Sequence, residues 1–137
     1  QYVMIEQAVD GFEVGCAVFG NHTLFTGEID EIELSGDFFD FQEKYSLKSS
    51  AIHLPARVSS ETALRIKQTA QQLYRLLRCK GFARVDLFVD RQGKILFNEI
   101  NTIPGFTAHS RYPNMMRGAG VDFPQLVERL IETGLEQ

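Results

Sequence analysis

Two strand-like runs joined by a short turn constrain this chain more than any other feature of its sequence. The runs Phe82 to Asp90 and Lys94 to Asn101 are rich in β-branched and aromatic residues. Between them, Gln92-Gly93 is typical of a two-residue hairpin turn. We therefore predict an antiparallel hairpin in which Arg91 pairs with Lys94, and this pairing determines the other cross-strand partners.

The predicted register places four polar side chains on one face of the hairpin. Asp86 lies opposite Glu99, and Arg84 lies opposite Asn101. Directly opposed residues have Cβ atoms roughly 5 Å apart, so these side chains can meet. The intervening positions form a core layer on the other face: Val85, Leu87 and Ile100.

Two carboxylates and a carboxamide form a cluster of hard oxygen ligands of the kind that Mg²⁺ prefers. Asp86, Glu99 and Asn101 would supply the protein oxygens, and nucleotide phosphates with water would complete the coordination. The alternative is an ordinary solvated sheet face on which Arg84 forms an ion pair with Asp86 or Glu99. The pattern by itself leaves both interpretations open.

The first third of the chain predicts an antiparallel meander. Strands are expected at Tyr2 to Gln7, Phe12 to Phe19 and Thr23 to Leu34. The intervening turns are Asp10-Gly11 and Gly20-Asn21-His22. Together with the hairpin, these strands would form one antiparallel sheet.

Three helices complete a predicted α+β fold. The first begins after Ser59 or Ser60 and stops at Gly81, and its apolar stripe consists of Ala63, Ile66, Ala70, Leu73, Leu76 and Leu77. A short helix is expected near Asn114 to Arg117, and a last one from Phe123 to Leu135. We expect the helices to pack on one face of the antiparallel sheet.

Two loops carry residues suited to binding. The segment 36–50 is aromatic and charged without a clear period, which is typical of a long functional loop. The second loop, Thr102 to Pro113, follows the acidic cluster directly, and Gly105 could bring a backbone N–H close to a reacting group. Ser110 beside Arg111 would suit a carboxylate. Taken alone, the second loop could equally be a surface loop that ends in a helix N-cap.

Composition excludes several classes of function. The 137 residues carry a net charge of -4, so no overall basic field attracts nucleic acid or an anionic membrane. No apolar run approaches the ~20 residues that cross a bilayer, and we expect a soluble, cytoplasmic protein. The two cysteines and three histidines lack the spacing of a metal site or a disulfide framework.

The motifs taken together resemble a known family. The runs are 81–86 (GFARVD), 97–107 (FNEINTIPGFT) and 109–113 (HSRYP), with the loop 38–45 (FFDFQEKY). In this combination they closely resemble the carboxy-terminal ATP-grasp region of D-alanine-D-alanine ligases, over essentially the whole chain. The resemblance implies that residues 1–12 end the central ATP-grasp subdomain and that residues 13–137 form the carboxy-terminal subdomain. The amino-terminal domain would be absent from this chain.

The family reaction is ATP-dependent formation of a dipeptide through an acyl phosphate. The resemblance implies ATP and two Mg²⁺ ions as cofactors, with Asp86, Glu99 and Asn101 as the metal ligands. The residues implied to bind ATP are Glu6, Val9, Glu13, Phe38 and Lys44. Those implied to take part in catalysis are Arg84, the Gly105 N–H and Tyr45, while Ser110 and Arg111 would hold the carboxylate of the second amino acid.

Two motifs bear on the second substrate. Lys44-Tyr45 is similar to the dipeptide-forming ligases, and Ser110-Arg111-Tyr112-Pro113 is similar to the vancomycin-resistance ligases. The combination resembles D-alanine-D-serine ligases most, which implies a homodimeric parent enzyme acting in peptidoglycan synthesis. The alternatives are a housekeeping D-alanine-D-alanine ligase, another ATP-grasp amide ligase, or a non-catalytic nucleotide-binding domain. The last alternative is supported by the lack of a Gly-Ser-rich phosphate loop in the sequence. We expect the chain alone to be inactive, because by the family resemblance it supplies only one wall of the active-site cleft.

Overall fold

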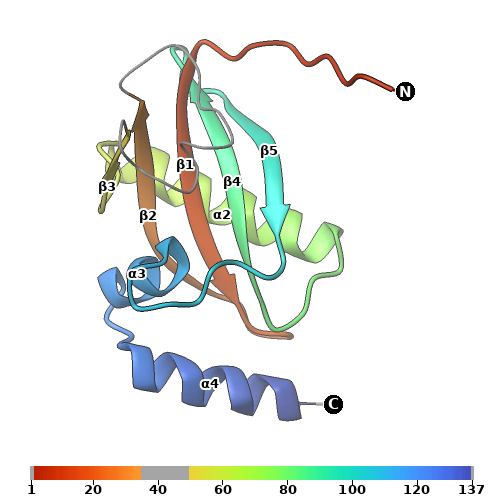
Figure 1. Ribbon diagram of the computed structural model, residues 1–137, viewed down its shortest axis with the longest axis vertical. Helices are drawn as coiled ribbons and strands as arrows, with labels where there is room; N and C mark the ends of the chain where they lie inside the picture. The colour runs from red at the N-terminus through yellow and green to blue at the C-terminus, as the bar shows by residue number, and fades with distance from the viewer. Residues whose placement is uncertain (1, 35–49, 137) are drawn as a thin grey trace.

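The computed structural model describes residues 2–34 and 50–136, which form a five-stranded antiparallel sheet with three helices (Figure 1). The sheet order is β3-β2-β1-β4-β5. The strands are β1 (Gly11–Phe19), β2 (Phe25–Leu34), β3 (Ser50–His53), β4 (Phe82–Asp90) and β5 (Ile95–Asn101). The helices are α2 (Ser60–Leu76), α3 (Arg111–Gly118) and α4 (Phe123–Leu135). The predicted α+β class with an antiparallel sheet is confirmed.

The helices lie on both faces of the sheet, and not on one face as predicted. In Figure 1, α2 crosses behind the sheet, α3 lies in front of it and α4 runs below. Small residues on the front face let α3 approach closely. A Cβ atom added to Gly27 would lie 3.0 Å from backbone atoms of Met115 in α3. Ala17 is fully buried beneath the same helix.

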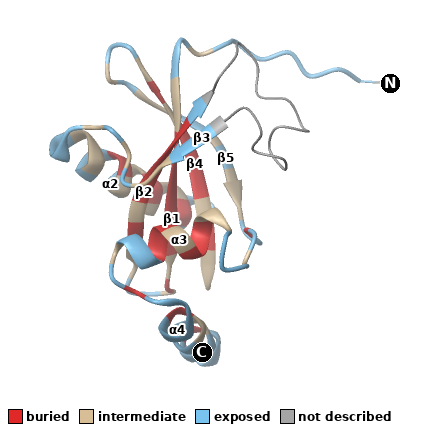
Figure 2. Ribbon diagram, turned by 60° about the vertical axis from the view of Figure 1, so that its left-hand side comes forward, coloured by how far each residue is buried: buried red, intermediate tan, exposed pale blue. Residues whose placement is uncertain are grey.

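The two faces carry separate hydrophobic cores, and the buried residues gather on the central strands and on α3 (Figure 2). The core under α2 contains Val14, Cys16, Val18, Ile29, Ile66, Ala70, Tyr74, Ala83, Val85, Leu87 and Val89. The core under α3 contains Ala17, Tyr112, Met115, Met116, Val121 and Leu126. Successive residues of β1 therefore point into opposite cores, so both faces of this strand are buried.

The first predicted helix starts where the sequence indicates but ends earlier. Ser59 is its N-cap and accepts a hydrogen bond from the Thr62 N–H. The helix ends at Leu76, well before Gly81, because Arg78 adopts a left-handed backbone conformation with φ of 56°. The N–H of Cys79 then bonds to the Tyr74 carbonyl, and that of Arg78 to the Arg75 carbonyl, a Schellman termination.

Two members of the predicted apolar stripe were placed wrongly. Ile66 and Ala70 are buried as expected, and Ala63 and Leu73 pack against the core. Leu76 and Leu77 are exposed instead, because the last turn extends past the edge of the core. Tyr74 takes the buried position there and donates a hydrogen bond to the Gly20 carbonyl.

The two carboxy-terminal helices follow their predicted patterns. The short helix α3 begins at Arg111, three residues before the predicted start, while α4 covers the predicted range. Asp122 and Gln125 form a capping box at the start of α4. Among the described residues, no helix is both long and apolar enough to span a membrane.

Residues 2–9 have no regular secondary structure, so the predicted strand Tyr2 to Gln7 is wrong for this structure. The side chains from Tyr2 to Ala8 are exposed, and the segment leads away from the sheet in Figure 1. No strand within residues 2–34 and 50–136 pairs with it, and an isolated extended segment gains no ladder hydrogen bonds. Of the predicted loop 36–50, residues 36–49 lie outside the described residues, and Ser50 begins β3.

The β4–β5 hairpin confirms the predicted partners, although its turn differs from the prediction. The Asp90 N–H bonds to the Lys94 carbonyl, so three residues form the turn, with Gly93 in a left-handed conformation. This turn shifts the register by one residue, and a bulge next to Asp86 shifts it back. The two irregularities cancel before the polar positions are reached.

Candidate functional site

A row of four residues crosses the centre of the sheet, one from each of the strands β2, β1, β4 and β5. Gly15 pairs with Asp30 on one side and with Asp86 on the other, and Asp86 pairs with Glu99. Two residues along, on the same face, Arg84 pairs with Asn101. The predicted block of four polar residues on one sheet face is therefore confirmed, and β1 extends it with Gly15 and β2 with Asp30.

Arg84 and Asp86 form a bidentate ion pair within this block. The Arg84 Nε lies 2.8 Å from Asp86 Oδ1, and its Nη2 lies 2.7 Å from Oδ2. The Asp86 side chain is 1% exposed and that of Arg84 is 15% exposed. The ion pair foreseen in the alternative interpretation exists, but on a buried face and not on a solvated one.

A second bidentate pair joins α3 to the sheet. Arg111, the first residue of α3, donates from Nε and Nη2 to the two carboxylate oxygens of Asp30, at 2.8 and 2.7 Å. Asp30 Oδ1 also accepts the backbone N–H of Gly15. The Arg111 guanidinium further lies 3.7 Å from Asp86 Oδ1 and 3.6 Å from Glu13 Oε1.

The electrostatics of this group keep Arg111 charged. Burial on its own lowers the pKa of the guanidinium. The hydrogen bonds and charge of Asp30 oppose that effect, together with the charges of Asp86 and Glu13, and the pKa of Arg111 is raised above its ordinary value. The side chain predicted to hold a substrate carboxylate is thus already bound to a carboxylate of the protein.

Glycine is required at position 15 by this arrangement. A Cβ atom there would lie 2.5 Å from Arg111 Nη2, 2.6 Å from Asp30 Oδ1 and 2.7 Å from Met115 Cε. The two charged groups can meet above β1 only because this strand has no side chain at that point. Neither Gly15 nor Asp30 was among the predicted site residues, although an isolated glycine inside an apolar strand often marks a close approach.

The loop after β5 brings two further predicted residues together. A Cβ atom on Gly105 would lie 3.0 Å from the Ser110 hydroxyl, so the two residues are neighbours. The Ser110 hydroxyl accepts the Thr107 N–H at 3.0 Å and orders the turn before α3. Within the described residues the Gly105 N–H makes no hydrogen bond, so it can donate to a ligand.

A pocket of about 530 Å³ lies between the segment 7–10 and the β4–β5 hairpin. It contains Val9, which was predicted to contact adenine, and its opposite wall includes Leu96 and Phe97. Sequence reasoning missed these two side chains, whose signal was an apolar pair in β5 that ends two residues before Glu99. Its other lining residues are Ala8 and the polar Gln7, Asp10, Asp90, Arg91, Gln92 and Lys94, so the pocket combines a few apolar contacts for a planar base with polar groups.

The other predicted ATP ligands lie apart from this pocket or outside the described residues. Glu6 is exposed on the amino-terminal segment. Glu13 lies on β1, close to Arg111. Phe38, Lys44 and Tyr45 fall within residues 35–49 and are outside the description. The structure therefore brings together the polar block and the Gly105 loop, but not the complete predicted ATP site.

The oxygen ligands of the block, from Asp86, Glu99 and Asn101, suit a metal ion that also binds the phosphates of a substrate. No group of three His, Cys, Asp or Glu side chains among the described residues is arranged to hold a metal ion. Asp86 and Glu99 supply two carboxylates, and Asn101 adds a carboxamide oxygen, which accepts the Ile103 N–H. Mg²⁺ is commonly held by one or two carboxylates together with phosphate oxygens and water, and this set fits that pattern.

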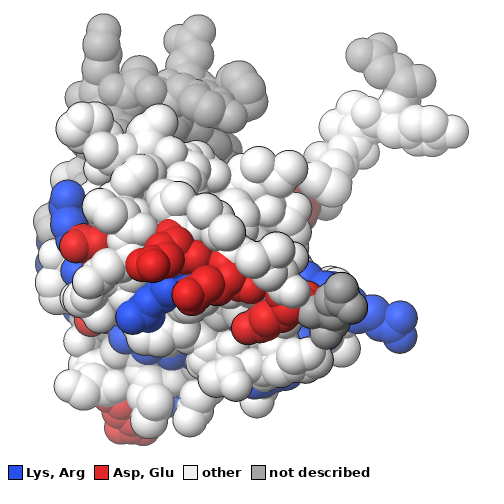
Figure 3. Space-filling view, turned by 90° about the horizontal axis from the view of Figure 1, so that it is seen from below, with Lys and Arg blue, Asp and Glu red and all other residues white. Residues whose placement is uncertain are grey.

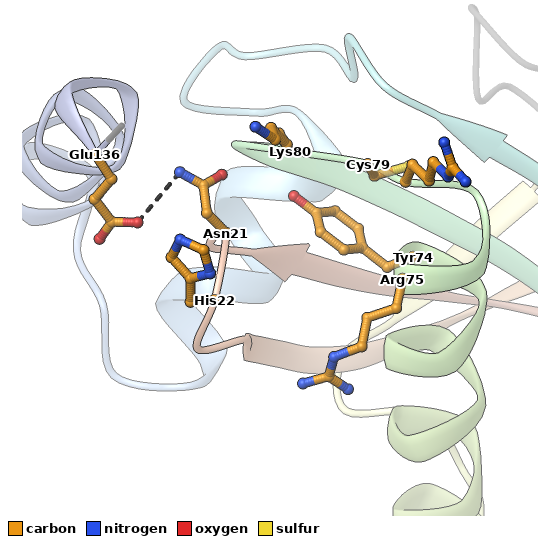
Figure 4. A pocket seen from close by; sticks show the side chains of 8 residues that line it. Asn21, His22, Tyr74, Arg75, Cys79, Lys80 and Glu136 are labelled. Atoms are coloured by element: carbon orange, nitrogen blue, oxygen red, sulfur yellow. Dashed lines mark hydrogen bonds between the residues drawn. The ribbon is translucent and has the colours of Figure 1, made fainter.

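A second pocket, of about 380 Å³, lies between the β1–β2 turn and the end of α2 (Figure 4). Asn21 connects the β1–β2 turn to the segment before β4 and to the end of α4. It accepts the Gly81 N–H, and its side-chain amide donates to the Thr133 carbonyl at 2.8 Å and to Glu136 at 3.2 Å. None of the predicted site residues lines this pocket.

Acidic side chains gather on the face of the molecule that is seen from below (Figure 3). They form a band on the underside of the molecule, where α4 lies (Figure 3). The exposed acids of α4 and its two caps are Asp122, Glu128, Glu132 and Glu136.

Comparison with known proteins adds a family and relatives to this geometry. Residues 1–132 match the family model described as "D-ala D-ala ligase C-terminus". The vancomycin/teicoplanin A-type resistance protein VanA of Enterococcus faecium is 45% identical over 98% of the chain, which spans 40% of that protein. The chain thus covers about two fifths of this relative's length.

Two solved structures resemble the fold closely. The VanG D-Ala:D-Ser ligase from Enterococcus faecalis superposes with a TM-score of 0.84 and 55% identity, over 93% of this chain and 37% of that one. The D-alanine–D-alanine ligase from Bacillus anthracis, solved in complex with ATP, gives a TM-score of 0.77 and 30% identity. It covers 95% of this chain and 41% of that one.

Proposed function

The chain belongs to the family of D-alanine–D-alanine ligase carboxy-terminal regions, and from this premise we propose that it forms part of an ATP-dependent ligase. The enzyme would join D-alanine to a second D-amino acid. ATP would phosphorylate the first carboxylate, and the amine of the second substrate would then attack the acyl phosphate. The observation that carries the proposal is the block of Arg84, Asp86, Glu99 and Asn101 on one sheet face.

We assign Asp86, Glu99 and Asn101 to two Mg²⁺ ions in this reaction. The metal would neutralise charge on the phosphoryl group during transfer. Glu99 is exposed at the edge of the sheet while Asp86 is buried beside it, so the block faces the side from which phosphates can approach.

Arg84 and the Gly105 N–H are proposed to stabilise negative charge on the carbonyl oxygen during attack. A guanidinium and a backbone N–H are both suitable donors for a developing oxyanion. Arg84 lies within the block and Gly105 follows it along the chain. The free N–H of Gly105 in the described structure supports its part in this role.

For ATP, we propose that Val9 and the apolar wall of its pocket hold adenine. Leu96 and Phe97 also line this pocket, and Glu6 and Glu13 stay as proposed polar contacts. Phe38, Lys44 and Tyr45 keep the roles that the resemblance implies for them. The ATP complex of the similar Bacillus anthracis ligase supports the choice of nucleotide.

The second substrate is proposed to be D-serine. Two observations support this choice: the sequence Ser110-Arg111-Tyr112-Pro113 and the similarity to a D-Ala:D-Ser ligase at 55% identity. Ser110 and the Nη1 side of Arg111 would hold the substrate carboxylate, because Nε and Nη2 already donate to Asp30 while Nη1 lies 3.6 Å from Glu13 Oε1, beyond hydrogen-bond range. D-alanine is the alternative second substrate, and the fold that this chain shares with a D-alanine–D-alanine ligase supports that alternative.

The first residues of the chain support the proposed division into subdomains. Tyr2, Val3, Met4 and Ile5 are four consecutive apolar residues, each more than 80% exposed. Such a run is typical of a segment that packs against another part of a larger protein. We propose that residues 1–12 belong to the central subdomain and that residues 13–137 form the carboxy-terminal one. A homodimeric, cytoplasmic parent enzyme of peptidoglycan synthesis and vancomycin resistance remains a prediction.

The test is a product assay on the full-length protein that carries this chain. The protein is incubated with Mg²⁺-ATP and D-alanine, alone or with D-serine or D-lactate, and the products are separated by chromatography. We expect D-alanyl-D-serine as the main product when D-serine is present. D-alanyl-D-alanine as the main product would favour the housekeeping alternative, and nucleotide binding without any product would favour a non-catalytic domain.

A further inference from the structure

Both oxygens of the proposed metal ligand Asp86 are occupied by a side chain of the same strand. Arg84 Nε lies 2.8 and 3.0 Å from the two Asp86 oxygens, and Nη2 lies 2.7 Å from Oδ2. The guanidinium covers one edge of the carboxylate, and only 1% of the Asp86 side chain is exposed, so a divalent cation reaches these oxygens only when a covering group moves aside.

The burial of Asp86 explains why the positively charged Arg84 guanidinium lies beside it. With 1% of its side chain exposed, Asp86 has lost its hydration, and an unpaired carboxylate would be strongly destabilised. The row contains two such acids, and each has an arginine of its own. Arg111 is bound to Asp30, so Arg84 neutralises Asp86.

We propose that Arg84 and the metal exchange at Asp86, so that metal binding releases Arg84 for catalysis. This inference rests on the proposed function. The incoming cation replaces the guanidinium as the counter-ion of Asp86, and the buried carboxylate is neutralised in both states. The released Arg84 stays on the same sheet face, next to the reacting centre, and can then bind the developing oxyanion.

The exchange affects Arg84 and leaves Arg111 in place. Arg111 donates two hydrogen bonds to Asp30, a carboxylate outside the proposed metal set, and it begins a helix packed on the sheet. Its distance to Asp86 Oδ1 is 3.7 Å, beyond hydrogen-bond range. Arg111 thus supplies an internal control for any experiment that follows both guanidinium groups.

The direct test follows both arginines by NMR in the full-length protein with labelled arginine and aspartate. Mg²⁺ is titrated with and without a non-hydrolysable ATP analogue. We expect the Asp86 carboxyl carbon and the Arg84 Nε–H signals to shift together, while the Arg111 Nε–H, which stays hydrogen-bonded to Asp30, shifts less. Asp86→Asn, which keeps the size of the side chain, provides the reference position of Arg84 without a carboxylate partner.

Two outcomes separate this inference from the proposed function. A metal-dependent shift of Asp86 with Arg84 unmoved would overturn the exchange and leave the metal assignment standing. No metal-dependent shift at Asp86 or Glu99, even with the nucleotide analogue, would overturn both.

Metal affinity gives a second measurement that distinguishes exchange from simple charge repulsion. Arg84→Lys keeps the charge and loses the bidentate geometry, and Arg84→Gln loses both. If the guanidinium competes with the metal, both variants bind Mn²⁺ at least about tenfold more tightly than the wild type, measured by water proton relaxation. Repulsion alone predicts tighter binding only for Arg84→Gln, so wild-type affinity in Arg84→Lys would overturn the proposal.

Discussion

Arg111 and Asp30, 81 positions apart in the sequence, meet in a bidentate ion pair directly above Gly15. The pair joins the first turn of α3 to the central strands of the sheet. It also places a fixed positive charge 3.7 Å from Asp86, the proposed metal ligand. The stability of the fold and the geometry of the proposed site therefore depend on the same contact.

Gly15→Ala should destabilise the protein by about 2–3 kcal/mol, because the new Cβ atom overlaps the Arg111–Asp30 pair and Met115. The free energy of unfolding, measured by urea titration, checks this. Gly134→Ala is the matched control. No atom lies within 4 Å of its added Cβ, so that variant should equal or slightly exceed the wild type. Equal stability of Gly15→Ala and the wild type would contradict the close approach.

Asp30→Asn should cost about 3–5 kcal/mol of stability, since it leaves the buried Arg111 guanidinium without its carboxylate. The same titration measures the loss. Asp10→Asn removes the partner of Arg91 from a pair that is 72–80% exposed, and it should change stability by less than about 1 kcal/mol. Similar losses in both variants would show that burial does not distinguish the two pairs.

Acid should weaken the attachment of the segment after β3 to β2. The Arg57 guanidinium and backbone N–H donate to Glu31, and the first of these contacts is the largest cause that lowers the Glu31 pKa below its ordinary value of 4.5. A carboxyl group whose pKa is lowered by folding stabilises the fold fully when the pH is above its ordinary pKa. This stabilisation is lost as the pH falls through the folded-state pKa.

The unfolding free energy measured from pH 7 down to pH 2 tests the role of Glu31. Glu31→Gln should reduce the acid-dependent loss of stability. Glu33→Gln serves as the control, because its carboxylate is about half exposed and should contribute less. A pH profile of Glu31→Gln that parallels the wild type would argue against this role.

Asp86→Ala or Glu99→Ala in the full-length protein should lower Mg²⁺-ATP-dependent phosphate release with D-alanine by about 10³-fold or more, because the metal ligands are lost. A coupled phosphate assay measures the rate. Circular dichroism establishes that each variant is folded. Glu128→Ala, on the exposed face of α4, should retain wild-type turnover. Unchanged turnover in either site variant would refute the metal assignment.

Local patterns were sufficient for the elements whose contacts are close in sequence. The Ser59 cap, the range of α4 and the Asp86–Glu99 pairing all follow from neighbouring residues. The pairing was predicted correctly although the turn was not, because the bulge compensates for the longer turn. The end of α2 was missed, because Arg78 adopts a backbone conformation that usually requires glycine.

The sequence by itself determined the polar block of β4 and β5, since strand alternation places those side chains on a common face, although a longer turn and a bulge set their register. Only the tertiary structure decided that the block continues through Gly15 to Asp30, and that α3 covers this continuation on β1 and β2. Those contacts join segments far apart in the chain, and they depend on small residues that let a helix approach the sheet. Periodicity carries no signal for such contacts, because it reports which face a residue occupies and not which element will cover that face.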